Sequence, residues 1–151
     1  MRAFALAASA MLMAASPAPA AILGSCTVVI GATGKLRNNP AITVLGSTQP
    51  GGSSATATVT ASSVLCSILN LLDCYSVSTP APAGFLAAPG NYSSALFSTV
   101  FRLGSGPDRP GNTPFRVANG TYQMQVDLTA ASTAGIFPAG PYRAEVTVRC
   151  E

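Results

Sequence analysis

The sequence predicts an all-β protein, an antiparallel β-sandwich of about seven strands, and three observations carry this prediction. Short segments in which apolar and polar residues alternate recur along the chain. The pieces between them are rich in Gly, Pro, Ser and Asn, residues that favour turns. The last residues of the chain alternate strictly, as a half-buried strand does.

Residues 1–20 are expected to be a secretory signal peptide. Arg2 supplies the positive n-region, residues 3–15 the apolar h-region, and the Ala-Pro-Ala sequence at 18–20 a cleavage site. An apolar stretch of about a dozen residues is too short to span a bilayer core of about 30 Å. Residues 21–151 are therefore expected to form one exported domain, secreted or at the cell surface of a bacterium after passage through the periplasm.

The strands are predicted in chain order from the alternating segments and their flanking turns. Within 120–131, Tyr122, Met124, Val126 and Leu128 are expected to share the face that covers the core. Residues 104–114 contain several Gly and Pro residues and are expected to interrupt the strands. The six strands predicted before the C-terminal one are 26–31, 41–46, 55–61, 74–78, 95–104 and 120–131.

The C-terminal strand follows a Pro-Ala-Gly-Pro turn. Its outward face carries Arg143, Glu145, Thr147 and Arg149. A strand of this kind must pair its edge with another strand, so its partner bears on function. The inward face is predicted to comprise Tyr142, Ala144, Val146, Val148 and Cys150.

Four cysteines, Cys26, Cys66, Cys74 and Cys150, lie in the exported part and predict two disulfides. Three connectivities are open, among them Cys26 to Cys66 with Cys74 to Cys150, and a local Cys66 to Cys74 bridge with Cys26 to Cys150. No metal site is expected, because the chain has no His and its cysteines lack the short spacing of a zinc site. The dense apolar stretch 64–74 is interpreted as a buried connection that Cys66 and Cys74 hold.

Composition argues against an enzyme and against a cofactor. Without His, a Ser-His-Asp or Cys-His site is impossible, and Lys35 lies in a glycine turn that lacks the spacing of a phosphate loop. A small hydrolase using Asp108, Asp127 and Glu145 is the enzyme alternative, but the carboxylates are dispersed along the chain. The small excess of basic residues is scattered, so no nucleic-acid partner is expected.

Several features together resemble the chaperone-usher pilin superfamily, and within it the spore coat protein U group. They are Cys26 at the start of the first strand, Cys66 after an ATATVT strand, a YSVS strand, and the closing AGPYRAEVTV sequence. The resemblance implies an immunoglobulin-like sandwich that lacks one strand. It also implies a secreted structural or adhesive surface subunit, of a pilus, fimbria or spore coat, with a periplasmic chaperone, an usher and other subunits as partners.

In that family a donor strand from the chaperone or from another subunit fills the groove left by the missing strand. The resemblance implies that Tyr142, Ala144, Val146 and Val148 line this groove, and that Cys26 pairs with Cys66. Residues 21–25 are too short for a donor strand, so the chain is expected to accept a strand without donating one, and the alternative is an assembly of a different kind. The alternative is a stand-alone envelope binding module or a lipoprotein, because residues 22–26 also fit a lipoprotein processing box. Only lipidation at Cys26 would place it on a membrane.

Overall fold

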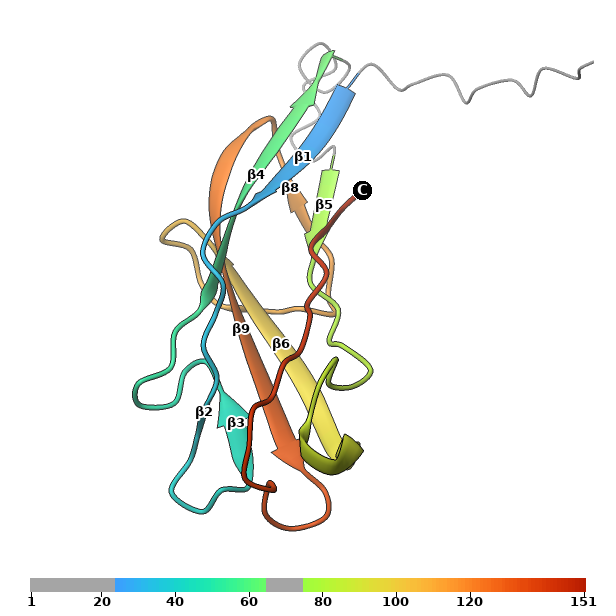
Figure 1. Ribbon diagram of the computed structural model, residues 1–151. Coiled ribbons are helices and arrows are strands. Elements are labelled where there is room, and N and C mark those ends of the chain that lie inside the picture. The colour runs from blue at the N-terminus through green and yellow to red at the C-terminus, as the bar shows by residue number, and fades with distance from the viewer. Residues whose placement is uncertain (1–23, 65–74) are drawn as a thin grey trace, which may run out of the picture.

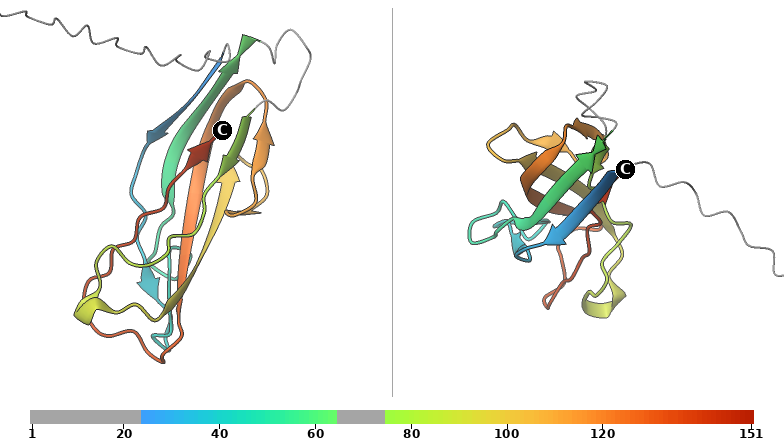
Figure 2. Two further views of the ribbon diagram at one scale, coloured as in Figure 1. Left: turned by 90° about the vertical axis from the view of Figure 1, so that its right-hand side faces the viewer. Right: turned by 90° about the horizontal axis from the view of Figure 1, so that it is seen from above.

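A computed structural model describes residues 24–64 and 75–151, which form two antiparallel sheets (Figure 1 and Figure 2). The all-β sandwich predicted from the sequence is confirmed, but the described residues form ten strands where about seven were predicted. The predicted signal peptide, Cys66, Cys74 and nearly all of the apolar stretch around them lie outside the described residues. Among the residues that are described, no helix is long and apolar enough to cross a membrane.

The larger sheet is built around β9 (Gly120–Ser132), the longest strand. On one side of β9 lies β6 (Ala95–Leu103), which pairs with it from Ala95 opposite Ser132 to Leu103 opposite Met124. On the other side, β4 (Ala55–Ser63) pairs with the first half of β9 and β3 (Val44–Gly46) with the second half. The outer strands are β1 (Gly24–Ile30) beside β4, β2 (Arg37–Asn38) beside β3, and β7 (Arg109–Pro110) beside β6.

The smaller sheet has three short strands in the order β10, β5, β8. They are β10 (Arg149–Cys150), β5 (Tyr75–Ser78) and β8 (Phe115–Val117). A 3₁₀ turn, η1 (Pro89–Asn91), lies in the connection from β5 to β6. The sandwich therefore has β1 as an edge of its larger layer and β10 as an edge of its smaller layer.

The strands predicted ahead of the C-terminal one all correspond to observed strands, with shifted ends. The prediction for 104–114 was wrong, because β7 lies within it and β8 follows it directly. Pro110 is compatible with a strand here because, among the strands that the structure describes, β7 pairs only with β6, so the missing N–H removes no bond on a second side. The C-terminal strand is regular only at β10, and the extended residues before it have no strand partner among the described residues.

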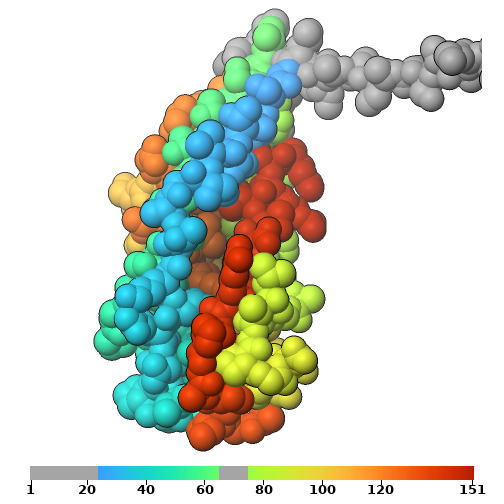
Figure 3. Space-filling view, in the orientation of Figure 1, coloured from blue at the N-terminus to red at the C-terminus, as the bar shows by residue number. Residues whose placement is uncertain are grey.

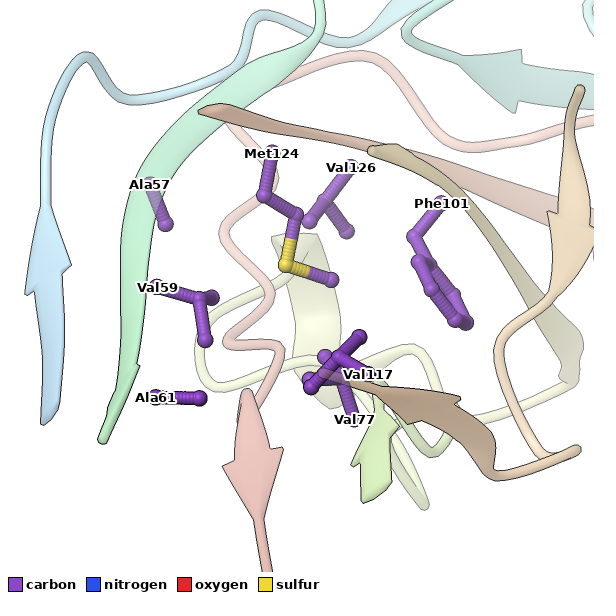
Figure 4. Close-up of a cluster of buried hydrophobic side chains, with 8 residues drawn as sticks. All are labelled: Ala57, Val59, Ala61, Val77, Phe101, Val117, Met124 and Val126. Atoms are coloured by element: carbon purple, nitrogen blue, oxygen red, sulfur yellow. The ribbon is translucent and has the colours of Figure 1, made fainter. Parts of the chain in front are cut away.

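The main core lies between the two sheets (Figure 4). Alternate residues of β4 and β9 point into it, which confirms the inward face predicted for Met124, Val126 and Leu128. Phe101 of β6 is the largest side chain that is fully buried there. Burying a side chain of this size stabilises the fold by about 1.5–3 kcal/mol. The smaller sheet closes the core with Val77 and Val117.

A second cluster, in which aromatic rings pack on one another, lies beyond the main core. Phe85 meets Phe97 and Tyr142 at ring-centroid distances of 4.8 and 4.9 Å, and Phe137 meets Tyr142 at 5.5 Å. These edge-on and tilted arrangements are the favourable ones for aromatic pairs. They fix Tyr142, and with it the point where the chain enters its final segment.

Candidate functional site

A groove separates the two edges of the sandwich, and Figure 3 shows it as a hollow between the blue N-terminal strand and the red C-terminal segment. Its volume is about 520 Å³. One wall is the end of β1 and the chain that follows it, here called the leading wall (residues 30–36). The other wall is the terminal segment (residues 142–148). The floor is formed by side chains of β4 and β9 together with Ser47.

Small and aliphatic residues dominate the groove. Ala55 and Ala57 of β4 lie beside Val126 and Leu128 of β9, so the floor is apolar. Ile30, on the leading wall, is 65% exposed although it is a large aliphatic residue. The full lining comprises Ile30, Ala32, Thr33, Gly34, Leu36, Ser47, Ala55, Thr56, Ala57, Val126, Leu128, Tyr142, Arg143, Ala144, Glu145, Val146 and Val148.

The terminal segment shows the alternation that its sequence predicts. Its inward residues are half-buried, whereas its outward residues, and Arg149 beyond it, are exposed. Val146 and Val148 pack against the main core, and Tyr142 packs against the aromatic cluster. The inward residues are Tyr142, Ala144, Val146 and Val148, and all four lie along the groove.

Over five consecutive residues, the backbone of the terminal segment has no partner within residues 24–64 and 75–151. At one end the N–H of Arg143 donates to the carbonyl of Ala87, and its carbonyl accepts from the N–H groups of Leu86 and Ala87. At the other end Arg149 and Cys150 pair with β5. Between these points, residues 144–148 make no backbone hydrogen bond to any described residue. An extended backbone in this state is a template for another strand.

The directions of these unpaired groups follow from the paired ones. The N–H and C=O of Arg143 and of Glu151 point away from the groove, to Ala87 and to Ser76. Because backbone groups alternate in direction along a strand, those of Ala144, Val146 and Val148 point the opposite way, towards the leading wall. The residues whose side chains line the groove thus also present their backbone groups to it.

The leading wall is likewise open on its groove side. β1 pairs only with β4 within the described part of the chain. Beyond β1, the N–H of Gly31 donates to the carbonyl of Thr56, and Lys35 exchanges hydrogen bonds with Ser53, all on the side away from the groove. Gly34 lies so close to the start of β4 that a Cβ on Gly34 would be 2.8 Å from the backbone nitrogen of Ala55.

A disulfide joins Cys26 of β1 to Cys150 of β10, with a Cα–Cα distance of 6.0 Å. The Cys26 to Cys66 pairing that the family resemblance implies is therefore wrong for this structure, as is a Cys74 to Cys150 pairing. The physical reason is the packing of the two edge strands, which brings the start of β1 beside the end of the chain. A sulfur in a disulfide cannot carry a lipid, so this bond argues against the lipoprotein alternative.

Charged groups are sparse around the groove. Arg143 and Glu145 line it, and neither forms an ion pair with another described residue. Burial, and secondarily the neighbouring Tyr92, raises the pKa of the Tyr142 hydroxyl above its ordinary value. This hydroxyl donates a hydrogen bond of 2.7 Å to the carbonyl of Pro138.

The carboxylates of the hydrolase alternative lie on different elements and have different partners. Asp127 of β9 accepts hydrogen bonds from Ser47 and Ser54, at 2.6 and 2.7 Å, and so holds the turn between β3 and β4. Asp108 lies 3.7 Å from Arg102 in an exposed ion pair. Within the described ranges no three His, Cys, Asp or Glu side chains gather as a metal site would require.

Sequence reasoning named the terminal wall of the groove but missed the leading wall and the floor. One signal was available, since residues 28–30 are Val-Val-Ile, apolar on both faces, and Val29 and Ile30 are both exposed. A comparison with protein families, with curated proteins and with solved structures finds no match to this chain. The groove is therefore the feature of the molecule that bears on its function.

Proposed function

We propose that this chain is a secreted bacterial surface subunit, structural or adhesive and without catalytic activity, whose groove accepts a β-strand from a protein partner. The partner would be a periplasmic chaperone during export and another subunit after assembly. The single observation that carries the proposal is the backbone of residues 144–148, which has no partner in the described part of the chain and faces an apolar groove.

A strand in this groove would lie between the edges of both sheets. Backbone hydrogen bonds to Ala144, Val146 and Val148 would supply affinity, and alternate side chains would fill the space over the apolar floor. Burial of apolar surface contributes about 25 cal/mol per Å², so covering the exposed side chain of Ile30 favours occupancy. The sequence resemblance to strand-accepting subunits supports the same proposal.

Filling the groove from its floor tests the proposal. Ala55→Leu, at a half-buried residue of the floor, places a larger side chain in the space that the donor side chains would use. The matched control is Thr58→Leu, on the same strand and the opposite face. Both variants are expressed with the native signal in the native bacterium, and the amount of assembled protein on the cell surface is measured with an antibody.

The proposal expects export of both variants and surface assembly of Thr58→Leu alone. Assembly of Ala55→Leu at the wild-type level would contradict it. If Ala55→Leu does not fold, Ala144→Leu on the opposite side of the groove replaces it, with the outward Thr147→Leu as its control.

A further inference from the structure

We propose that the groove takes one short strand, about five to seven residues long, whose end stops at the Cys26–Cys150 disulfide. This inference rests on the proposed strand acceptance and adds the length and chemistry of the accepted segment. It distinguishes this short accepted segment from a long donor strand that would run along the full height of the sandwich.

The disulfide closes one end of the groove. A strand that pairs with two neighbours lies about 4.8 Å from each, so the two walls must be about 9.6 Å apart where it passes. At the disulfide the Cα atoms of Cys26 and Cys150 are 6.0 Å apart. No strand fits between them, and the accepted segment must end before it reaches this bond.

The unpaired backbone sets the length. Residues 144–148 extend over about 17 Å at about 3.3 Å per residue. Three of these residues point their backbone groups into the groove, so a strand of about five residues can bond to all of them, and about one more residue fits at each end. Residues beyond this length gain no further backbone partner on the terminal segment.

The side chains around the groove set the composition. Ala55 and Ala144, both half-buried, leave room for larger aliphatic side chains at alternate positions of the accepted strand. Its other positions face solvent along the rim, where Arg143 and Glu145 lie two residues apart and form no ion pair with any residue that the structure describes. The complementary strand therefore carries one acidic and one basic residue two positions apart, since unlike charges on adjacent strands attract.

A length series tests the inference. Fluorescent synthetic peptides with alternating Thr and Val or Leu, from three to eleven residues long, are titrated into the oxidised protein, and affinity is measured by fluorescence anisotropy. Affinity is expected to rise by about tenfold or more up to about seven residues and then to stay constant. The matched control has the composition of the seven-residue peptide with its apolar residues made consecutive.

The outcomes separate the two proposals. Affinity that keeps rising through eleven residues would overturn the length limit and leave strand acceptance standing. Binding no tighter than that of the control at every length would contradict strand acceptance itself. A plateau near seven residues, with weaker binding of the control, supports both.

A second binding experiment tests the part assigned to the rim charges, Arg143 and Glu145. The peptides Glu-Val-Lys-Leu-Lys-Val-Glu and Lys-Val-Glu-Leu-Glu-Val-Lys place their charges opposite Arg143 and Glu145 in either strand direction, and they do so in opposite orders. The wild-type protein is expected to prefer one of them, and the charge exchange Arg143→Glu with Glu145→Arg is expected to reverse the preference. Equal affinities in both proteins would overturn the part assigned to the rim charges.

Discussion

Cys26 and Cys150 are bonded across the two sheets, which ties the first described strand to the last. The bond joins residues 124 positions apart in the chain, and both belong to edge strands. It fixes the two walls of the groove relative to each other at one end. The groove is thus a feature of the oxidised protein, in which both edge strands are held although neither pairs directly with the other.

Removal of this bond is expected to destabilise the fold strongly. In the chain-entropy description, closing a loop of this length stabilises by about 5 kcal/mol, and measured values are commonly about 2–5 kcal/mol. The variant Cys26→Ala with Cys150→Ala should lose an amount in this range in urea unfolding followed by circular dichroism. A loss below about 1 kcal/mol would mean that the bond contributes little to the fold.

Phe101 is expected to be a main support of the core. Its ring is 1% exposed, so Phe101→Ala should lower the free energy of unfolding by about 3–5 kcal/mol. Leu96→Ala on the same strand is the control, because Leu96 is 69% exposed and should change stability by at most about 0.5 kcal/mol. Equal effects of the two substitutions in urea unfolding would contradict the described packing.

Asp127 is expected to stabilise the turn between β3 and β4. Asp127→Ala removes the acceptor for Ser54 and for the buried hydroxyl of Ser47, a loss of about 1–3 kcal/mol. Asp108→Ala removes an exposed carboxylate and should cost at most about 1 kcal/mol. Thermal unfolding of the two variants compares them, and a larger effect at Asp108 would argue against the structural role of Asp127.

Gly111 is expected to tolerate no side chain. A Cβ at this position would collide with the hydroxyl of Thr99 and the carbonyl of Thr79, and both of these threonines are buried. Gly111→Ala should therefore cost about 1–3 kcal/mol through overpacking. Gly84→Ala meets no atom within 4 Å and is the control, expected to be neutral or slightly stabilising. Equal unfolding temperatures of the two variants would contradict this prediction, because Thr79 and Thr99 would then have moved to make room for the new side chain.

The sequence was sufficient for features that depend on local alternation. The faces of β9 and of the terminal segment could be predicted because one side of each is buried, and burial imposes a period of two. The strands β7 and β8 could not, since Gly and Pro dominate residues 104–114 and the neighbouring strands select their conformation. The partner of Cys26 could not be chosen either, because it depends on which edge strands meet in the folded sandwich.

The groove was predictable only on one side. Alternation identified the inward residues of the terminal segment, yet it says nothing of whether their backbone finds a partner. The absence of a described strand beside residues 144–148 is a property of the assembled sheets, as is the position of Ile30 on the opposite wall. Both depend on contacts between residues far apart in the chain.

Amide hydrogen exchange over residues 144–148, measured by mass spectrometry or NMR, tests the central claim most directly. In the free protein these amides should exchange much faster than those of β9, because they have no partner among the described residues. On addition of the seven-residue alternating peptide, the amides of Ala144, Val146 and Val148 should become protected. Unchanged fast exchange at saturating peptide, or full protection in the free monomer, would contradict strand acceptance by this groove.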